Sequence, residues 1–172
     1  DKGADRLVDA ACKLAPEFPG LQLRMIGCGD ENFVKNLHSR TVASGYSDLL
    51  DLPGFVNRRE LPAYLSRAHV FAMPSTYEPG PGLVYLEAMA CGLPVIACKG
   101  AGAAEVVISE RNGLLVPPRQ EAALVCSLRR LLAKPAESEE MGERARRYVL
   151  EEFDSKNCLL RIEAFYAFVA AG

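Results

Sequence analysis

The stretch VFAMPSTYEPGPGLVYLEAMACGLPVIAC, residues 70–98, contains the pattern that predicts the fold. Its first five residues, VFAMP, and its last six, LPVIAC, are short apolar runs typical of buried strands. Between them, residues 82–91 are predicted to form a helix that begins just after a bend rich in glycine and proline. A strand, a helix and a second strand in this order predict a parallel βαβ unit.

The same alternation continues in both directions along the chain. Further strands are expected at residues 21–26, 50–52 and 113–116, and further helices at residues 5–15, 30–44, 61–68, 103–107, 120–133, 138–152 and 157–170. Strands separated by helices of this length predict an α/β fold, a doubly wound parallel sheet of the Rossmann type. Asn57 and Glu60 have the spacing of a capping box, and residues 134–140 are predicted to be a turn between helices.

At 172 residues the chain has the length of one domain, so residues 1–172 are predicted to be a single domain closed by helices at about 138–170. Asp1, Lys2 and Gly3 directly precede the first expected helix. Because a βαβ unit needs a strand at that point, we expect that the first strand of the domain is missing.

Composition narrows the functional classes. A net charge of −2 gives no electrostatic footprint for nucleic acid or anionic lipid. No uncharged apolar run approaches the roughly 20 residues of a membrane span, and no signal segment opens the chain. These features predict a soluble, cytoplasmic protein. The six cysteines form no C-x-x-C pair and are predicted to fill the core, and the two histidines predict no metal site.

Three glycine turns each follow an expected strand and precede a helical segment: residues 27–29, 80–82 and 100–102. Ligands of parallel sheets bind at the carboxyl ends of the strands, where helix N-termini favour phosphate. The turns therefore predict a site for a polyanionic ligand. A nicotinamide-type site is disfavoured, because Asn32 stands where the dinucleotide fingerprint needs its third glycine, and no Walker A lysine follows any turn.

Two carboxylates, Glu78 and Glu87, flank the bend at residues 80–82. If the helix begins at Gly82, Glu87 lies about 7.5 Å further along its axis. A phosphate bound at the helix start would then place Glu87 near an adjacent ribose, and Glu78 would face the other end of the ligand. The alternative is that Glu87 caps the helix, although it lies beyond the N3 position of a helix capped by Gly82.

Residues 74–118 strongly resemble the nucleotide-sugar-binding half of the GT-B glycosyltransferases, in the retaining family 4 group (glycosyl transferases group 1). The resemblance extends to Lys2-Gly3, to MIGCGD at residues 25–30 and to LPGFV at residues 52–56. It implies the C-terminal half of a GT-B fold, which binds a UDP- or GDP-type sugar donor. It also implies transfer with retention of configuration and without a metal or other cofactor, which agrees with the absence of a D-x-D motif from the sequence.

The resemblance also implies roles for single residues. As catalytic residues it indicates Lys2, which would neutralise the leaving diphosphate, and Glu78, near the hydroxyls of the donor sugar. Glu87 would bind the ribose. The other donor-binding residues that it implies are Phe55 and Val56 at the base, Gly82, Leu83 and Val84 at the phosphates and sugar, and Gly29 and Glu105 in the same cleft. For Glu105, capping of the short helix at 103–107 is the alternative.

Two departures from the family pattern affect these expectations. The family commonly has seven residues between the paired glutamates, whereas eight separate Glu78 from Glu87 here. Either the bend bulges by one residue, which we expect, or the Glu78 carboxylate is displaced. We also expect that the N-terminal domain, which would bind a glycan, lipid or small-molecule acceptor, is missing from this chain. Any peripheral membrane contact would belong to the full-length protein.

The fragment is therefore expected to bind nucleotide without catalysing transfer. A non-catalytic nucleotide-binding or scaffold module derived from a glycosyltransferase is the alternative.

Overall fold

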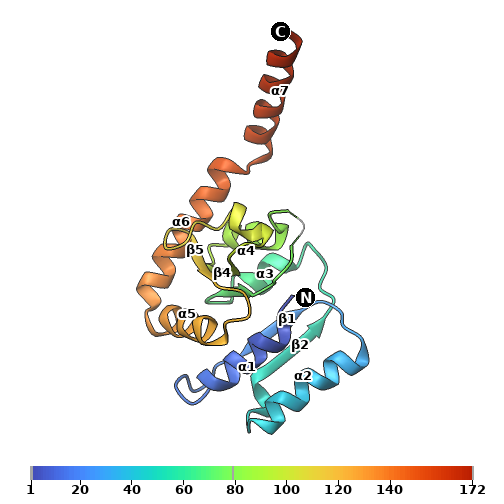
Figure 1. Cartoon of the computed structure of the whole chain (residues 1–172), viewed down its shortest axis with the longest axis vertical. Coiled ribbons are helices and arrows are strands. Elements are labelled where there is room, and N and C mark those ends of the chain that lie inside the picture. The colour runs from blue at the N-terminus through green and yellow to red at the C-terminus, as the bar shows by residue number, and fades with distance from the viewer. Residues whose placement is uncertain (1, 79, 172) are drawn as a thin grey trace.

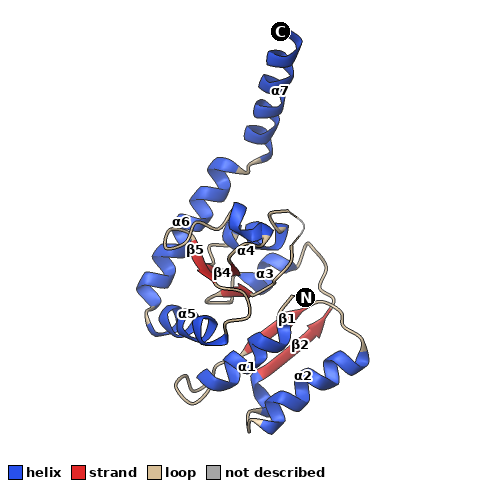
Figure 2. Ribbon diagram, viewed as in Figure 1, coloured by secondary structure: helices blue, strands red, loops and turns tan. Residues whose placement is uncertain are grey.

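The computed structural model describes residues 2–78 and 80–171, and it has the expected parallel α/β fold (Figures 1 and 2). In chain order its elements are α1 (Ala4–Leu14), β1 (Leu23–Ile26), α2 (Glu31–Ala43), η1 (Ser47–Leu49), β2 (Leu50–Gly54), α3 (Leu61–Leu65), β3 (Phe71–Met73), α4 (Leu83–Ala90), β4 (Val95–Cys98), η2 (Gly102–Glu105), β5 (Gly113–Val116), α5 (Glu121–Ala133), α6 (Pro135–Glu152) and α7 (Ser155–Ala171). The η elements are short 3₁₀ helices. Strands and helices alternate as the sequence predicts.

The described strands form two parallel sheets. In one, β1 pairs with β2, and a hydrogen bond from the Gly27 N–H to the Gly54 carbonyl (2.9 Å) continues the pairing past the end of β1. In the other, β4 lies between β3 and β5. The carboxyl ends of the strands in each sheet therefore share one edge. The additional strand expected before α1 stays a prediction.

The central strand β4 shows why both faces of its sheet are covered. Ile96 and Cys98 pack into a cluster with residues of α1 and α5, whereas Val95 and Ala97 pack into a second cluster with residues of α4 and α6. All four side chains are buried. Since neighbouring residues of a strand point to opposite faces, the apolar run at residues 95–98 needs helices on both sides.

The predicted capping box at residues 57–60 is wrong. The Asn57 side chain accepts a hydrogen bond from the Arg59 N–H, two residues on (3.0 Å), and the N-cap of α3 is Glu60. Asparagine closes such local turns readily, and this competes with the reach to the third residue that a capping box requires. Helix α3 nevertheless begins at Leu61 as expected, and it ends at Leu65, three residues before the predicted end.

The turn predicted at residues 134–140 is also wrong, because α6 begins at Pro135 and Lys134 alone separates it from α5. Proline suits the first position of a helix, where its missing N–H has no partner to lose. Arg130 of α5 forms ion pairs with Glu137 in the first turn of α6 and with Glu110 (2.5 and 2.7 Å). The pair with Glu137 joins the two helices across the sharp connection, and the pair with Glu110 joins α5 to the segment before β5.

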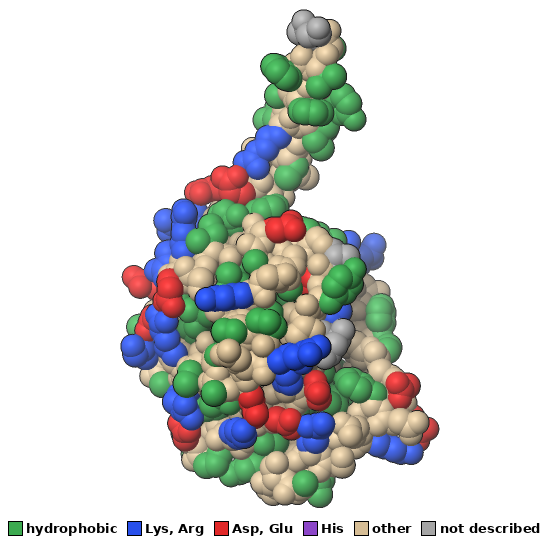
Figure 3. Space-filling view, in the orientation of Figure 1, with side chains coloured by type: hydrophobic (Ala, Val, Ile, Leu, Met, Phe, Trp, Pro, Cys, Tyr) green, Lys and Arg blue, Asp and Glu red, His purple; other side chains and the backbone are tan. Residues whose placement is uncertain are grey.

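The last helix, α7, projects away from the body of the protein (Figure 1). Seven of its large apolar side chains are exposed: Leu159, Leu160, Ile162, Phe165, Tyr166, Phe168 and Val169. Figure 3 shows hydrophobic side chains along this helix. Among the described residues, no helix combines the length and the apolar character needed to cross a membrane.

Candidate functional site

The start of α1 lies against the end of β3. Gly3, the N-cap of α1, has a left-handed conformation (φ +74°), and a Cβ added to it would stand 2.6 Å from the Pro74 carbonyl oxygen. The Arg6 guanidinium donates a hydrogen bond to the same carbonyl (2.9 Å). Only glycine combines this conformation with so close an approach. The packing brings Lys2 to the carboxyl end of β3.

Lys2 and Glu78 form an ion pair at this end of the sheet. Lys2 Nζ lies 2.6 Å from Glu78 Oε1, and the Lys2 side chain is 63% exposed whereas that of Glu78 is 6% exposed. The second carboxylate oxygen, Oε2, lies 3.9 Å from the place that a Cβ on Gly82 would take. The two residues expected to be catalytic are therefore in contact, beside the start of α4.

Helix α4 begins where the sequence predicts. Gly82 is its N-cap, in a left-handed conformation (φ +67°), and no side chain caps the first turn. The first-turn N–H groups of a helix have no partner within the helix, so this end is suited to an anion. Leu83 and Val84, the first two residues of the helix, expose their side chains.

Glu87 lies further along α4, with its side chain 30% exposed, and its Oε1 stands 3.6 Å from Arg58 Nη2. Arg58 follows Phe55 and Val56, which come directly after β2, and the Phe55 side chain is 77% exposed. Arg58 thus connects the turn after β2 with α4. Sequence reasoning missed Arg58, whose sole signal was its position three residues after Phe55.

Tyr85 and Met89 are fully buried and pack in the core between α4 and the sheet. The Tyr85 hydroxyl donates a hydrogen bond to the Met73 carbonyl (2.6 Å), which fastens α4 to the end of β3. Burial, with a smaller contribution from the negative charge of Glu78, raises the pKa of Tyr85 above its ordinary value of 10.0. The hydroxyl therefore remains a hydrogen-bond donor at neutral pH.

The turn at residues 100–102 supports the turn at residues 80–82. A Cβ on Gly102 would lie 1.7 Å from the Gly80 carbonyl oxygen and 2.8 Å from that of Glu78. The two backbones are thus in contact through a residue that has no side chain. Glu105 is exposed at the end of η2, whose N-cap is Ala101 without a side-chain cap. The capping alternative for Glu105 is therefore wrong.

The turn at residues 27–29 differs from the other two. Gly29 is exposed after β1, but Asp30 caps α2, and its carboxylate accepts a hydrogen bond from the Phe33 N–H (2.9 Å). A negative charge of the protein already occupies this helix start, which disfavours a phosphate there. Of the three predicted phosphate-binding turns, the one at residues 80–82 has the uncapped α-helix.

The predicted one-residue bulge in the bend before Gly82 would involve Pro79, which lies outside the described residues. Within the described part of the chain, no group of three or more His, Cys, Asp or Glu side chains is placed to hold a metal ion.

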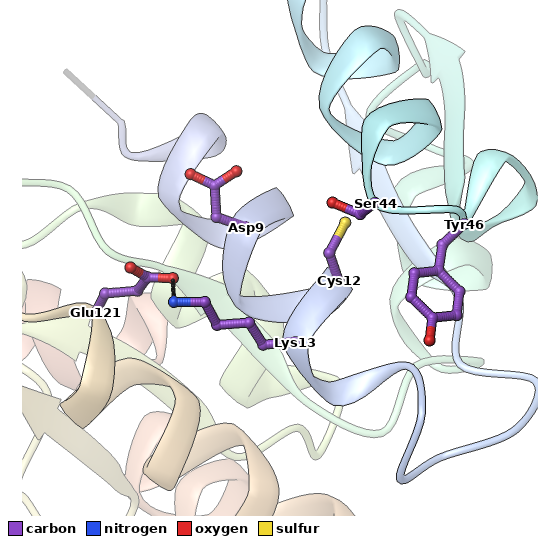
Figure 4. A pocket seen from close by; sticks show the side chains of 6 residues that line it. All are labelled: Asp9, Cys12, Lys13, Ser44, Tyr46 and Glu121. Atoms are coloured by element: carbon purple, nitrogen blue, oxygen red, sulfur yellow. Dashed lines mark ion pairs between the residues drawn. The ribbon is translucent and has the colours of Figure 1, made fainter.

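A separate pocket is lined by none of the predicted site residues (Figure 4). Its lining residues are Asp9, Cys12, Lys13, Ser44, Tyr46 and Glu121, with an ion pair between Lys13 and Glu121 (2.6 Å). The candidate site is instead the open edge formed by the strand ends and the start of α4.

Comparison with known proteins gives consistent matches. The profile of the family described as "Glycosyl transferases group 1" matches residues 1–148. A GDP-mannose-dependent alpha-(1-6)-phosphatidylinositol monomannoside mannosyltransferase from Mycolicibacterium smegmatis is 32% identical over 158 residues, which are 88% of this chain and 41% of the relative.

Two solved structures share the fold. Sucrose-phosphate synthase from Thermosynechococcus elongatus superposes with a TM-score of 0.85 at 34% identity, over 99% of this chain and 43% of that one. Anabaena HepE in complex with UDP superposes with a TM-score of 0.86 at 26% identity, over 96% of this chain and 45% of that one.

The chain spans about 40% of the length of the curated relatives that it matches. The family profile covers most of the chain, from Lys2 through the start of α4 to α6. The parallel α/β fold agrees with that match. The chain belongs to the glycosyl transferases group 1 family.

Proposed function

We propose that this chain is the nucleotide-sugar donor-binding part of a retaining, metal-independent glycosyltransferase of family 4. The observation that carries the proposal is the Lys2–Glu78 pair beside the uncapped start of α4, with Glu87 further along the same helix. A cation and free helix N–H groups suit a diphosphate, and a partly exposed carboxylate suits the ribose hydroxyls.

The donor would lie along the edge in a defined direction. Its diphosphate would face Lys2 and the N–H groups of Leu83 and Val84, and its ribose would face Glu87. The base would lie at Phe55 and Val56, and Gly29 and Glu105 would border the same cleft. Glu78 would lie toward the donor sugar.

During transfer, negative charge builds up on the departing nucleoside diphosphate. The Lys2 ammonium and the dipole of α4 would stabilise that charge, and both are in place before the reaction begins. Groups that need not reorganise as charge develops lower the barrier most effectively. Retention of configuration and independence of metal are parts of this proposal.

The relatives support a nucleotide donor. HepE was solved with UDP and with UDP-glucose, and the mycobacterial mannosyltransferase is named as dependent on GDP-mannose. UDP and GDP are therefore both candidate nucleotides. The acceptor is proposed to bind to a part of the protein outside these 172 residues.

Calorimetric titration of the 172-residue chain with UDP, GDP and ADP tests the proposal. We expect saturable binding of UDP or GDP, and a loss of roughly tenfold in affinity for Glu87→Gln, as when a charged hydrogen-bond acceptor is lost. For a nucleotide that lacks the 2′- and 3′-hydroxyls, the wild-type chain and Glu87→Gln should have the same affinity. Glu139→Gln on α6 is the control. A folded chain that binds none of the three nucleotides would refute the proposal.

A further inference from the structure

The position of the Glu78 carboxylate is unusual for a group whose sole partner would be a sugar. Its side chain is 94% buried, and Oε1 already lies 2.6 Å from Lys2 Nζ. Oε2 faces Gly82 at the start of α4, not open solvent. The Glu78 carboxylate thus lies between the Lys2 ammonium and the start of α4, the helix that would bind the diphosphate.

An ion-pair partner would order the Lys2 side chain. Its side chain is long and 63% exposed, and α1 begins only at Ala4. A free lysine side chain of this kind samples many rotamers, and ordering it on a ligand costs entropy. An ion pair with a buried carboxylate holds the ammonium in one place before the ligand arrives.

The backbone around Glu78 is itself held by its neighbours. Its carbonyl oxygen lies 2.8 Å from the place of a Cβ on Gly102, and the Ser75 hydroxyl donates a hydrogen bond to the Tyr77 carbonyl (2.8 Å). A buried charge must be paired and packed to be tolerated. These contacts hold the backbone at Glu78 in place, so the carboxylate can fix the position of the more exposed Lys2 ammonium.

We infer that Glu78 is a positioning residue, which holds the Lys2 ammonium at the start of α4 and contributes to diphosphate binding through Lys2. The inference rests on the proposed function and sharpens it, because it assigns Glu78 to the diphosphate of the donor as well as to its sugar end. It predicts that Glu78 matters even for a nucleotide that carries no sugar.

Three ligands separate this role from direct sugar binding: a nucleoside, its diphosphate and the corresponding nucleotide sugar, such as uridine, UDP and UDP-glucose, or the guanine series if the wild type prefers it. We expect Glu78→Gln to weaken binding of the diphosphate by roughly tenfold, the effect of disordering one charge-assisted contact, and to weaken binding of the nucleotide sugar at least as much. Binding of the nucleoside should not change. Lys2→Ala should show the same pattern.

The double variant gives the decisive coupling. If Glu78 acts through Lys2, Lys2→Ala combined with Glu78→Gln should bind UDP no more weakly than Lys2→Ala alone. Lys2→Ala and the double variant should also lose less UDP affinity as the salt concentration rises, because each lacks the positive charge of Lys2. Glu78→Asp keeps the charge and should retain more UDP affinity than Glu78→Gln. It also serves as the second variant if Glu78→Gln does not fold.

Several results would overturn the inference. Unchanged UDP affinity with weaker UDP-glucose binding would assign Glu78 to the sugar alone. Tighter UDP binding by Glu78→Gln would show that the carboxylate merely repels the phosphates, and additive effects in the double variant would show independent roles. Lys156→Ala and Glu139→Gln serve as matched controls on α7 and α6. A wild-type chain that binds none of the ligands refutes the proposed function instead.

Discussion

At the scale of single residues, Tyr85 joins the candidate site to the core. Its ring packs edge-to-face on Phe71, with 5.7 Å between ring centroids, and its hydroxyl binds the Met73 carbonyl. A Cβ on Gly82 would lie 2.8 Å from the same ring, so the N-cap of α4 rests on Tyr85. One buried side chain thus sets the distance between the end of β3 and the start of α4.

Tyr85→Phe is expected to lower the free energy of unfolding by about 1 kcal/mol, the net contribution of one hydrogen bond. The substitution keeps the ring but removes one of two hydrogen bonds to the Met73 carbonyl, which still accepts from the Ser75 N–H (2.8 Å). Urea unfolding at pH 7 measures the change. Tyr77→Phe is the matched control, because the Tyr77 side chain is exposed. Equal stability of the two variants would contradict the prediction.

The same residue predicts a loss of stability in alkali. The pKa of Tyr85 is raised above 10.0 in the folded chain, whereas in the unfolded chain tyrosine ionises near pH 10. Above pH 10 the unfolded state therefore releases the proton more readily than the folded state, and stability falls as pH rises. Thermal unfolding of wild type and Tyr85→Phe between pH 7 and pH 11 should show their difference shrinking above pH 10. A constant difference would be inconsistent with a buried neutral phenol.

Some residues of the site could be predicted from the sequence and others could not. Gly82 and Glu87 could, because a glycine after a proline-rich bend marks a helix start and the helical rise then places Glu87. Arg58 could not, because its approach to Glu87 depends on how the segment after β2 is placed beside α4. The cysteines show the same limit: Cys12 and Cys98 are buried as predicted, but Cys28 and Cys126 are exposed.

At the scale of elements, the site depends on contact between two turns. The turns at residues 80–82 and 100–102 follow different strands and touch through the backbone at Gly102. Local sequence predicted both turns but not this contact. Conversely, β5 was predicted with its observed bounds, because four apolar residues between turns leave little alternative for a buried strand.

Gly102→Ala is expected to disturb this contact. The added methyl group would overlap the Gly80 carbonyl, so one turn must move, at a cost of about 1–3 kcal/mol in the free energy of unfolding. Because Glu78 and the start of α4 belong to the displaced segment, nucleotide affinity should also fall. Urea unfolding and nucleotide titration measure the two effects.

Gly45→Ala is the control for Gly102→Ala, since a Cβ at Gly45 meets no atom within 4 Å and costs backbone strain alone (φ +80°). It should leave nucleotide binding unchanged. A Gly102→Ala chain with wild-type affinity would show that the two turns are not coupled.

Helix α7 is expected to be dispensable for the fold. The three hydrophobic clusters of the described residues include no α7 side chain. Polar contacts join α7 to the end of α6: an ion pair between Arg161 and Glu152 (2.5 Å), and hydrogen bonds from Asn157 and Arg161 to the Glu151 and Glu152 carbonyls. Removal of residues 155–172 should leave the urea midpoint unchanged. Since exposed apolar patches promote association, the shortened chain should also associate less in sedimentation experiments.

Replacing Phe165 and Phe168 by Gln in the full chain separates the two effects of α7, because it keeps the helix and removes apolar surface. It should reduce association as the truncation does. A large drop in the urea midpoint after truncation would show that α7 stabilises the body of the protein.

At the scale of the whole molecule, the α/β class could be predicted from alternating strands and helices, but the division of the sheet could not. The sequence predicts one doubly wound sheet, whereas the described strands form a pair and a triplet. Strand order depends on long-range pairing that local periodicity does not encode. The carboxyl edge was nevertheless predictable, because every βα turn of a parallel sheet opens on it.

The whole chain is expected to bind a nucleotide-sugar donor without transferring the sugar. At a concentration of nucleotide one hundred times its dissociation constant, binding adds about 2.7 kcal/mol to stability, so the melting temperature should rise by roughly 5–10 °C. Transfer should be absent, because the proposed acceptor site lies outside a chain that spans about 40% of its curated relatives. A thermal shift with UDP-glucose or GDP-mannose, together with an assay for released UDP or GDP, measures both. Nucleotide release above the rate in buffer would show that these 172 residues already contain the reacting centre, whereas a thermal shift without release is the expected result.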